Sequence, residues 1–376
     1  MHRLHRSSAD ASVCLPACPL PVYGCARSRL GTSLAVLAGP RGPCDIYDDA
    51  GTPCVAAHST VRALYGGYTG PVYQVRRASD NATQDVGVLA AGGVANSSEQ
   101  DKFCESTDCI ISRIFDQSPR LNHLDLAFHR AGGGFPSGLD KGVNARKLKL
   151  SVGGHSVYGA YFEKQMGYRN ANTTGIATGD EPESMYMVTG GKTYNKGCCF
   201  DYGNAETSEF IGRPGGPPCP TNSDGHPDCR GAMEAISFSN VMSAGWTNGT
   251  GSGPWVRADF EDGIWAGNQT TVNELNTPID ADYVTAMLKG EPNRWALKGG
   301  NAQSGRLKTL FEGGRPVGYT TMKKEGAIIL GIGGDGGDNT VGIFFEGIMA
   351  TGFAKDATDD LVQANIVAAG YGRSII

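Results

Sequence analysis

The sequence has little charge, and the charges it has nearly cancel. Only 19% of its 376 residues are Asp, Glu, Lys or Arg, and the net charge is -5. Because it lacks a basic stripe, nucleic acid is not an expected partner. After residue 41, no apolar run approaches the roughly 20 residues that cross a bilayer, so a membrane is not an expected partner either.

Motifs for metals and nucleotides are also missing. Gly331–Gly336 formally matches G-x-G-x-x-G, but a turn and a strand pattern follow it where a dinucleotide site needs a helix. Gly190–Thr193 is not a phosphate loop, because Tyr186 stands where the first glycine belongs. We therefore expect no metal and no cofactor. The glycines around Asp335 are typical of a tight hairpin that lets the backbone approach a ligand.

Glycine and proline are abundant, with 55 and 19 residues. This composition favours many short strands and tight turns over long surface helices, in one large all-β domain or two ordinary ones. Alternating segments predict strands at 72–76, 109–115 and 156–162. Helical spacing predicts a short helix within 53–65 and another at 359–369, whose apolar face would carry Leu361, Val362, Ile366 and Ala369.

Eleven cysteines are many for a cytosolic enzyme, and eight of them lie close together in pairs. The pairs are Cys44 with Cys54, Cys104 with Cys109, Cys198 with Cys199, and Cys219 with Cys229. Local disulfides are favoured over zinc, because these spacings lack the histidine partners of a zinc site. The region 212–231, rich in Pro and Gly, is predicted to be a looped insertion pinned by its own bridge.

The first 41 residues differ from the rest. A basic beginning leads to a modest apolar run at 30–38, followed by small residues, which predicts a secretion leader or a disordered extension. Cys14, Cys18 and Cys25 then need no place in the mature fold. Five Asn-x-Ser/Thr sequons agree with a secreted, extracellular glycoprotein. They begin at Asn81, Asn96, Asn172, Asn248 and Asn268.

The stretch from Trp246 to Trp265 holds the main candidate site. In the alternating segment Trp255–Glu261, the side chains of Asp259 and Glu261 share one face with Trp255 and Arg257. Two carboxylates side by side repel each other, so such a pair has a counter-charge, a ligand or open solvent. Three of the four tryptophans lie in this stretch, and an aromatic plane beside carboxylates suits a sugar ring. The alternative is a half-exposed strand with solvated acids.

Together these features describe a secreted, disulfide-bonded, β-rich protein with carboxylates beside aromatic rings. Without a metal or cofactor signature, such a protein is most economically a glycoside hydrolase, whose reaction needs two carboxyl groups and little else. One carboxyl must be ionised to attack or to activate water, and the other must hold a proton.

From residue 42 to about 371, the sequence closely resembles the catalytic domain of glycoside hydrolase family 54, the α-L-arabinofuranosidase B group. The motifs that carry the resemblance include GPCDIY (42–47), TPCVAAHST (52–60), ATGDEPE (177–183), CCFDYGNAET (198–207) and KEGAIILGIGGD (324–335). The resemblance implies a jelly-roll, concanavalin-like β-sandwich with a few short helices, over residues 42–376. It also implies a retaining exo-acting enzyme that releases terminal α-L-arabinofuranosyl residues from arabinan, arabinoxylan and other arabinosides of plant cell walls.

The same resemblance assigns roles to individual residues. Glu261 matches the nucleophile and Asp335 the general acid/base. Asp259, Trp246 and Gly334 match substrate-pocket positions, and the Cys198–Cys199 pair matches a vicinal disulfide that lines the sugar site. The resemblance also implies the Cys44–Cys54 and Cys104–Cys109 bridges, whereas the Cys219–Cys229 bridge rests on spacing alone.

Two departures from the family pattern qualify these expectations. Asp262 and Gly263 stand where the family tends to have two asparagines, so a side-chain donor to the sugar would be lost at 262, while a backbone N–H at Gly263 would survive. The sequence ends at Ile376, without the C-terminal arabinose-binding module that family members commonly carry, which predicts either weaker retention on polymeric arabinoxylan or a truncated gene model. A related glycosidase with another glycone, such as a galactofuranosidase or β-xylosidase, and a non-catalytic lectin-like sandwich are the alternative functions.

Overall fold

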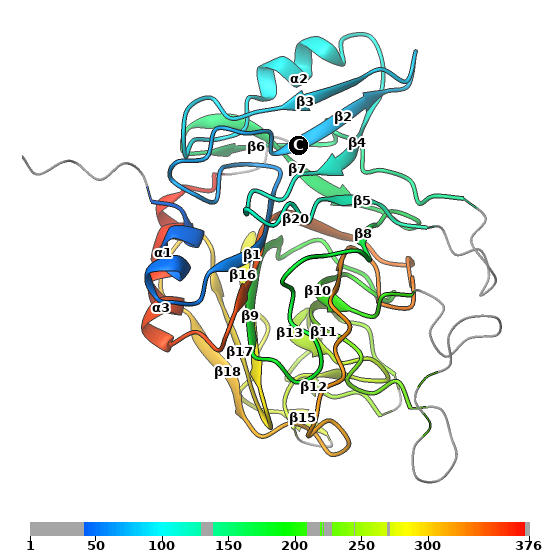
Figure 1. Ribbon diagram of the computed structural model, residues 1–376, viewed down its shortest axis with the longest axis vertical. Helices are drawn as coiled ribbons and strands as arrows, with labels where there is room; N and C mark the ends of the chain where they lie inside the picture. The colour runs from blue at the N-terminus through cyan, green and yellow to red at the C-terminus, as the bar shows by residue number, and fades with distance from the viewer. Residues whose placement is uncertain are drawn as a thin grey trace, which may run out of the picture. The chain divides into compact units, whose positions relative to one another are not determined.

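The computed structural model describes residues 41–128, 138–208, 219, 221, 228–243, 245–268 and 271–372 (Figure 1). The expected leader, with Cys14, Cys18 and Cys25, lies outside these residues apart from Arg41. Most of the expected insertion at 212–231 lies outside them as well, although both of its cysteines are described.

One sheet of eight strands has the order β18-β17-β16-β9-β20-β7-β6, with β1 also pairing with β20. Its strands are β1 (Cys54–Ser59), β6 (Leu148–Val152), β7 (His155–Phe162), β9 (Glu183–Gly190), β16 (Tyr283–Glu291), β17 (Arg294–Asn301), β18 (Lys308–Gly313) and β20 (Gly342–Thr351). All pairings in this sheet are antiparallel. The long strand β20 pairs with β9, β7 and β1, so it joins the two ends of the sheet.

A second sheet has ten strands in the order β14-β13-β11-β10-β19-β8-β5-β4-β2-β3. Its strands are β2 (Tyr73–Arg77), β3 (Thr83–Val86), β4 (Cys109–Ile114), β5 (Leu124–Leu126), β8 (Tyr168–Asn170), β10 (Asp201–Ala205), β11 (Glu234–Ser239), β13 (Trp255–Asp259), β14 (Ile264–Trp265) and β19 (Ala327–Leu330). A small parallel pair, β12 (Asn248–Gly249) with β15 (Val272–Asn273), lies outside both sheets.

The two large sheets pack against each other, with β11 and β13 against β9, β16 and β17. Strand β13 shows how the sequence specifies this packing. Val256 and Ala258 point into the shared hydrophobic core, whereas Arg257 and Asp259 alternate onto the opposite face. The expected all-β sandwich is thus confirmed. The predicted strands at 72–76, 109–115 and 156–162 correspond to β2, β4 and β7.

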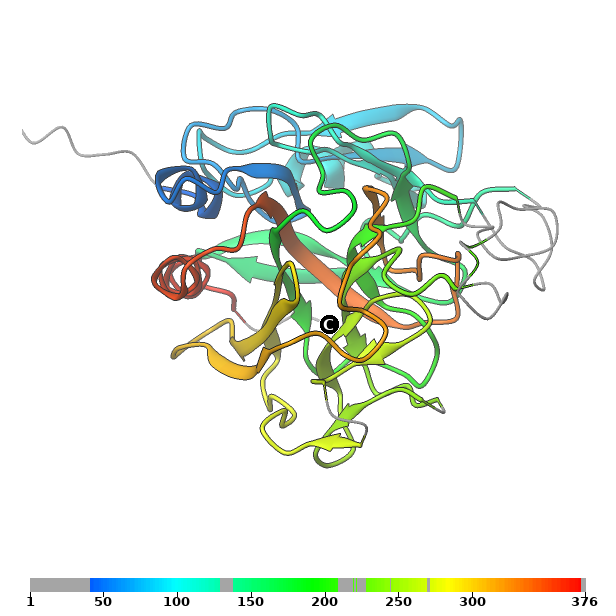
Figure 2. The same cartoon turned by 60° about the horizontal axis from the view of Figure 1, so that its bottom comes forward.

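Three helices are described: α1 (Pro43–Asp49), α2 (Ser97–Phe103) and α3 (Asp356–Ala368). Helices α1 and α3 lie side by side in both overall views (Figures 1 and 2). The helix predicted within 53–65 is wrong, because the segment forms β1 and pairs with β20; long-range pairing overrides its helical spacing. None of the helices within the described ranges is long and apolar enough to cross a membrane.

The predicted C-terminal helix is confirmed, but its apolar face is only partly as expected. Val362 and Ile366 are fully buried against the core, whereas Leu361 is 60% exposed. Two polar side chains of the helix, Asp359 and Gln363, are buried as well, which the predicted apolar face did not include. The helix therefore docks through polar contacts as well as through apolar ones.

All four predicted cysteine pairs are bonded in the structure: Cys44–Cys54, Cys104–Cys109, Cys198–Cys199 and Cys219–Cys229. Disulfides rather than zinc ligation therefore account for these eight cysteines.

Candidate active site

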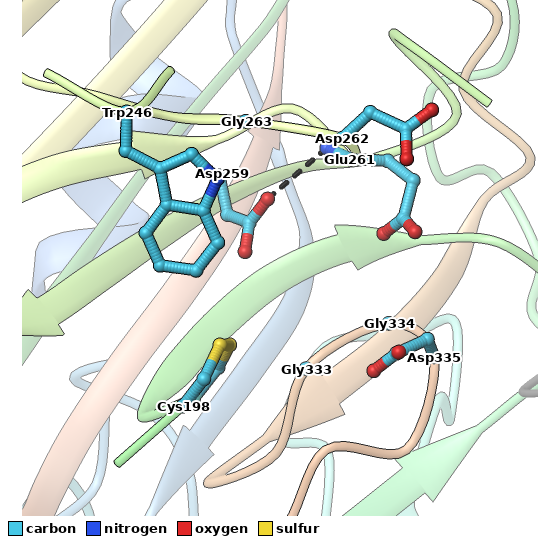
Figure 3. A pocket seen from close by; sticks show the side chains of 10 residues that line it. Cys198, Trp246, Asp259, Glu261, Asp262, Gly263, Gly333, Gly334 and Asp335 are labelled. Atoms are coloured by element: carbon cyan, nitrogen blue, oxygen red, sulfur yellow. Dashed lines mark hydrogen bonds between the residues drawn. A yellow bond between two sulfur atoms is a disulfide. The ribbon is translucent and has the colours of Figure 1, made fainter. Parts of the chain in front are cut away.

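A cavity of about 340 Å³ opens where three distant segments of the chain meet (Figure 3). Its lining includes all nine residues that the sequence analysis placed in the catalytic and sugar-binding site. The lining residues are Cys198, Cys199, Trp246, Asp259, Glu261, Asp262, Gly263, Gly333, Gly334 and Asp335. Only Gly333 was not expected, and it precedes two residues that were.

One wall of the pocket is apolar. The Cys198–Cys199 disulfide and Trp246 pack together with the buried side chains of Val241 and Ile264. Both sulfur atoms lie within 4.8 Å of a carboxylate oxygen of Asp259. The pocket thus places an apolar surface beside oxygens that can form hydrogen bonds. A sugar ring is complementary to this arrangement, because it has an apolar face and hydroxyl groups at its rim.

Asp335 lies in a tight turn that follows β19. The turn is closed by hydrogen bonds from Gly333 N–H to Gly337 O, 2.9 Å, and from Gly336 N–H to Gly333 O, 3.0 Å. Asp335 Oδ1 accepts the N–H of Gly337 at 3.0 Å. The turn also holds the disulfide loop, since Cys199 N–H donates to Gly337 O at 3.2 Å. The predicted tight turn with Asp335 in it is thus present, but the prediction of a hairpin is wrong, because β19 and the next strand, β20, belong to different sheets and do not pair.

Glu261 lies in the turn between β13 and β14, beyond the end of the strand in which the sequence analysis placed it. Glu261 and Asp262 have φ of 57° and 56°, and Phe260 N–H donates to Gly263 O at 3.1 Å. Two successive residues with positive φ are typical of a type I′ hairpin turn. Asp259 Oδ1 accepts Glu261 N–H at 3.1 Å, and Tyr319 donates its hydroxyl to Glu261 O at 3.0 Å. The Glu261 side chain points across the pocket towards Asp335 (Figure 3).

Asp262 connects the pocket to the Cys219–Cys229 bridge. The backbone N–H of Cys229 donates to Asp262 Oδ2 at 3.0 Å. Gly263, the next residue, has no room for a side chain, because a Cβ there would lie 2.6 Å from Trp265 Nε1 and 2.8 Å from the Tyr319 hydroxyl. The two positions at which the sequence departs from the family pattern are therefore held by contacts within this chain.

Of the three tryptophans in the central stretch, only Trp246 lines the cavity. Trp255 is buried and donates its ring N–H to Thr250 O at 2.8 Å. Trp265 packs edge-on against Tyr319, with ring centroids 5.4 Å apart. Clustering in the sequence was thus a poor guide to which indole faces a ligand.

A row of buried polar side chains underlies the pocket on the outer face of the ten-stranded sheet. The strand register places Asp201 opposite Ser237 and Ser237 opposite Arg257. Burial raises the pKa of Asp201 to about 7, and burial with the nearby Asp201 charge raises the pKa of Asp259 well above its usual range. Burial lowers the pKa of Arg257 to about 10. The site therefore holds carboxyl groups in an environment that resists charge.

Sequence reasoning missed two acidic residues near the pocket, Asp201 and Glu206. Glu206 follows β10, is fully buried and packs against Gly334. Glu206 belongs to the quoted motif CCFDYGNAET, but strand alternation could not show that it reaches the turn carrying Asp335. Burial raises its pKa to about 8, and the charges of Asp335 and Asp259 add to the increase.

The electrostatics of the pocket oppose an ionised Glu261. Burial raises the pKa of Glu261 well above its usual range, and Glu206, Asp259, Asp335 and Asp262 add to the increase when they are charged. A nucleophile has to be ionised, so its neighbours must be neutral or its charge must be stabilised in another way.

The five sequons differ in exposure. Asn81, Asn172 and Asn268 are exposed, while Asn96 and Asn248 are partly buried. The side-chain oxygen of Asn248 accepts a hydrogen bond from Arg257 at 2.9 Å. The exposed sequons are sterically more suitable for a glycan than Asn248.

A β-sandwich with two carboxyl groups in one pocket walled by an indole and a disulfide has the features expected of the glycoside hydrolase class. A family model described as "Alpha-L-arabinofuranosidase B, catalytic" matches residues 43–372. The chain therefore belongs to the family of alpha-L-arabinofuranosidase B catalytic domains.

Related sequences come from several fungi. A probable alpha-L-arabinofuranosidase B of Aspergillus terreus is 49% identical over 348 residues, 91% of this chain and 64% of that protein. The alpha-L-arabinofuranosidase B of Emericella nidulans is 49% identical over 88% of this chain and 62% of that protein. An arabinofuranosidase/B-xylosidase of Trichoderma koningii is 48% identical over 88% of this chain and 63% of that protein. The chain thus spans less than two thirds of the length of these relatives.

Solved structures agree with the sequence relatives. A GH54 α-L-arabinofuranosidase soaked with a cyclic sulfate inhibitor superposes with a TM-score of 0.80 at 45% identity, covering 88% of this chain and 66% of that one. An arabinofuranosidase complexed with arabinofuranosyl-alpha-1,2-xylobiose has the same TM-score at 44% identity and the same coverage. These matches confirm the predicted family and fold.

Proposed function

We propose that this chain is a retaining exo-glycosidase that hydrolyses terminal α-L-arabinofuranosyl residues of arabinan, arabinoxylan and smaller arabinosides. The observation that carries the proposal is the joint placement of Glu261 and Asp335 in one cavity, beside the Cys198–Cys199 disulfide. The solved relative that is bound to arabinofuranosyl-alpha-1,2-xylobiose supports an arabinose-containing oligosaccharide as the substrate class.

In the proposed reaction, Glu261 attacks the anomeric carbon while Asp335 protonates the departing oxygen. The bond to the leaving group breaks, and a covalent arabinosyl–Glu261 ester forms. Asp335, now a carboxylate, takes a proton from water, and the resulting hydroxide equivalent displaces Glu261. Asp335 is then protonated again, and the anomeric configuration is retained through two inversions.

The parts of the pocket have separate tasks in this reaction. The Glu261 turn is fixed by its bonds with Asp259 and Tyr319, and the Asp335 turn by its bonds with Gly337 and the disulfide loop. Trp246 and the disulfide provide an apolar wall for the small furanose ring. Each reacting carboxyl is therefore placed by main-chain hydrogen bonds in a rigid turn.

Replacing the proposed nucleophile tests the reaction. Glu261→Gln is expected to lower kcat on an aryl α-L-arabinofuranoside by roughly 10³-fold or more, because an amide cannot form the glycosyl ester. The control Glu105→Gln changes an exposed acid outside the pocket and is expected to retain activity. Undiminished turnover by a folded Glu261→Gln variant would refute the assignment.

Added azide separates the two catalytic roles. With Glu261→Ala, azide enters from the face that the glutamate occupied and should give the β-arabinofuranosyl azide. With Asp335→Ala and an activated substrate, azide should instead intercept the covalent ester and give the α-azide. The opposite pair of products would reverse the roles.

A different glycone is the second candidate function, since the Trichoderma koningii relative is named both arabinofuranosidase and B-xylosidase. The Asp262–Gly263 pair is the feature of this chain that favours it. Comparing kcat/KM on aryl α-L-arabinofuranoside, β-D-xyloside and β-D-galactofuranoside decides between them. A non-catalytic, lectin-like protein would bind these sugars and cleave none of them.

We also propose that the protein is secreted and glycosylated. Four disulfides and the exposed Asn81, Asn172 and Asn268 support this location, because disulfides persist in oxidising compartments. Expression in a fungal host should place the protein in the medium with an electrophoretic mobility that increases on deglycosylation. Retention of an unglycosylated protein inside the cell would contradict the proposal.

A further inference from the structure

Glu206 packs against the turn that carries Asp335. A Cβ atom built on Gly334 would lie 2.1 Å from Glu206 Oε2 and 2.7 Å from Oε1. The carboxyl group therefore packs against the backbone of the residue before Asp335, and any side chain at 334 would displace it. Glu206 is fully buried, so no part of it reaches solvent.

The guanidinium group of Arg169 lies nearby but donates no hydrogen bond to the carboxyl group of Glu206. Arg169 donates from Nη1 to Gly334 O at 2.8 Å and from Nη2 to the main-chain oxygen of Glu206. Among the described residues, no other residue donates a hydrogen bond to the carboxyl oxygens of Glu206, and only its own backbone N–H interacts with them, which lowers its pKa less than burial raises it. A buried carboxylate without hydrogen bonds is very costly, whereas a protonated carboxyl is much less so.

The charged groups that face Glu206 are mostly acidic. They are Arg169 on β8, Asp259 on β13, Glu261 in the following turn and Asp335 after β19. Of the nearby charges, Glu206 has the largest effect on Glu261, and it raises the pKa of Glu261. An anionic Glu206 would therefore oppose ionisation of the proposed nucleophile.

We propose that Glu206 is a positioning residue of the active site, a carboxylic acid kept neutral against Gly334 so that the negative charge of the pocket resides on Glu261. The role of Glu206 in keeping Glu261 ionised rests on the proposed function, but the protonation state of Glu206 can be measured without a substrate. Arg169 then holds the main chain of both segments through its hydrogen bonds, and its charge lowers the pKa of Glu206 by less than burial raises it.

Thermal unfolding of the full chain tests the protonation state. A carboxyl that is neutral in the folded protein up to about pH 8 ionises in the unfolded chain at about pH 4.3, so it destabilises the folded state progressively as the pH rises between these values. Glu206→Gln removes this dependence while keeping the shape. The difference in Tm, variant minus wild type, should therefore become more positive from pH 5 to pH 8.

Other outcomes contradict the proposal. If Glu206 were an anion stabilised by Arg169, the Gln variant would lose stability relative to wild type as the pH rises. A constant difference in Tm would mean that Glu206 titrates alike in both states, which also overturns it. Glu206→Ala serves as the second variant: it lowers Tm at every pH by leaving a cavity, and the same upward trend is expected with pH.

The pH profile of kcat/KM connects the protonation state to catalysis. The acid limb of this profile reports the ionisation of Glu261. If Glu206 is neutral in the wild type, the acid limb of Glu206→Gln should lie within about 0.3 pH units of the wild-type limb. If Glu206 were an anion, its removal would move that limb to lower pH by about one unit. Absence of glycosidase activity in the wild type would refute the proposed function, while the melting series would still decide the state of Glu206.

Discussion

At the scale of single residues, Asp262 is one of the two positions at which the sequence analysis expects this chain to depart from its family. Its side chain lines the pocket, and Oδ2 accepts the N–H of Cys229. A carboxylate can accept but not donate a hydrogen bond to a sugar hydroxyl. Its charge also contributes to the raised pKa of Glu261.

The substitution Asp262→Asn is expected to improve the pocket in two ways. The amide oxygen can still accept the Cys229 N–H while its NH₂ group donates to the sugar, so KM should fall by roughly 5- to 10-fold, which corresponds to one hydrogen bond. Removing the charge lowers the pKa of Glu261, so the acid limb of kcat/KM should move to lower pH. Steady-state kinetics between pH 3 and 7 measure both effects, and an unchanged limb with a higher KM would contradict the prediction.

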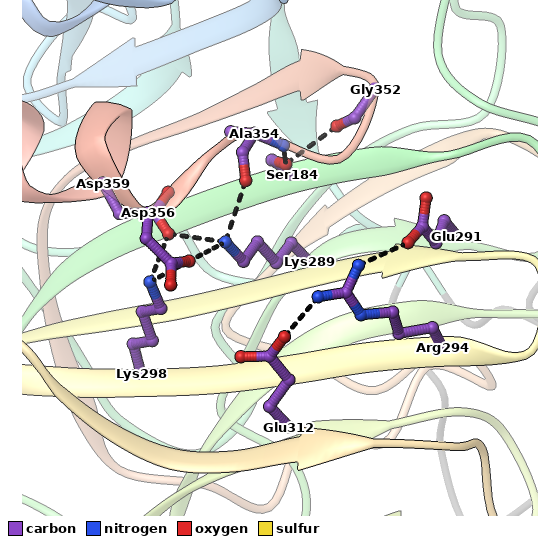
Figure 4. A network of polar contacts seen from close by, with 10 residues as sticks. All are labelled: Ser184, Lys289, Glu291, Arg294, Lys298, Glu312, Gly352, Ala354, Asp356 and Asp359. Atoms are coloured by element: carbon purple, nitrogen blue, oxygen red, sulfur yellow. Dashed lines mark hydrogen bonds and ion pairs between the residues drawn. The ribbon is translucent and has the colours of Figure 1, made fainter.

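At the scale of elements, α3 is attached to the eight-stranded sheet by a polar network (Figure 4). Asp359 Oδ2 lies 2.7 Å from both Lys289 Nζ on β16 and Lys298 Nζ on β17. Asp356 Oδ1 contacts the same two amines at 2.9 and 2.6 Å, but its side chain is 67% exposed whereas that of Asp359 is 2% exposed. Two buried lysines thus depend mainly on one buried carboxylate.

Asp359→Asn is therefore expected to lower the free energy of unfolding by about 3–5 kcal/mol, because it leaves two buried ammonium groups without their buried partner. Asp356→Asn is the matched control, and an exposed pair should cost no more than about 1 kcal/mol. Urea unfolding at pH 7 measures both. Equal losses for the two variants would show that the burial of Asp359 does not matter.

The pH dependence of the same network has a defined sign. Hydrogen bonds from Lys289 and Lys298 lower the pKa of Asp356 to about 2. A carboxyl with a lowered pKa in the folded state stabilises the protein above its unfolded pKa of about 3.9 and loses this effect as the pH falls towards 2. Any stability difference between wild type and Asp356→Asn should therefore vanish between about pH 4 and pH 2.

Strands were easier to predict from the sequence than the site's details. Alternation located β2, β4, β7 and the face of β13, because successive side chains in a strand point to opposite faces of the sheet. Local spacing failed at β1, which is a strand because β20 pairs with it across nearly the whole chain. It also failed for Trp255 and Trp265, which are placed by packing, and for Glu206, whose neighbour Gly334 is distant in sequence.

At the scale of the whole molecule, two disulfides each close a short loop between a helix and a strand. Cys44–Cys54 joins α1 to β1 across a separation of 10 residues, and Cys104–Cys109 joins α2 to β4 across 5. All four cysteines are buried. Replacement by alanine therefore removes similar packing in each pair, and the pairs differ mainly in the length of the loop they close.

We expect the Cys44→Ala/Cys54→Ala variant to lose about 3 kcal/mol of unfolding free energy and the Cys104→Ala/Cys109→Ala variant about 2 kcal/mol. Each bridge restricts the unfolded chain, and the longer loop restricts it more. Urea unfolding of the three proteins side by side gives the comparison. A larger loss for the shorter loop would indicate that native-state strain or packing outweighs loop entropy.

The position of β20 has a consequence for biosynthesis. This strand, Gly342–Thr351, is the partner of β1, β7 and β9, whose residues leave the ribosome long before it does. Until β20 emerges, those strands have unpaired edges that can associate with other chains. The turn with Asp335 emerges only shortly before β20, so a nascent chain has neither a complete sheet nor a complete pocket. We therefore expect productive expression to depend on protecting the early strands until β20 has been translated.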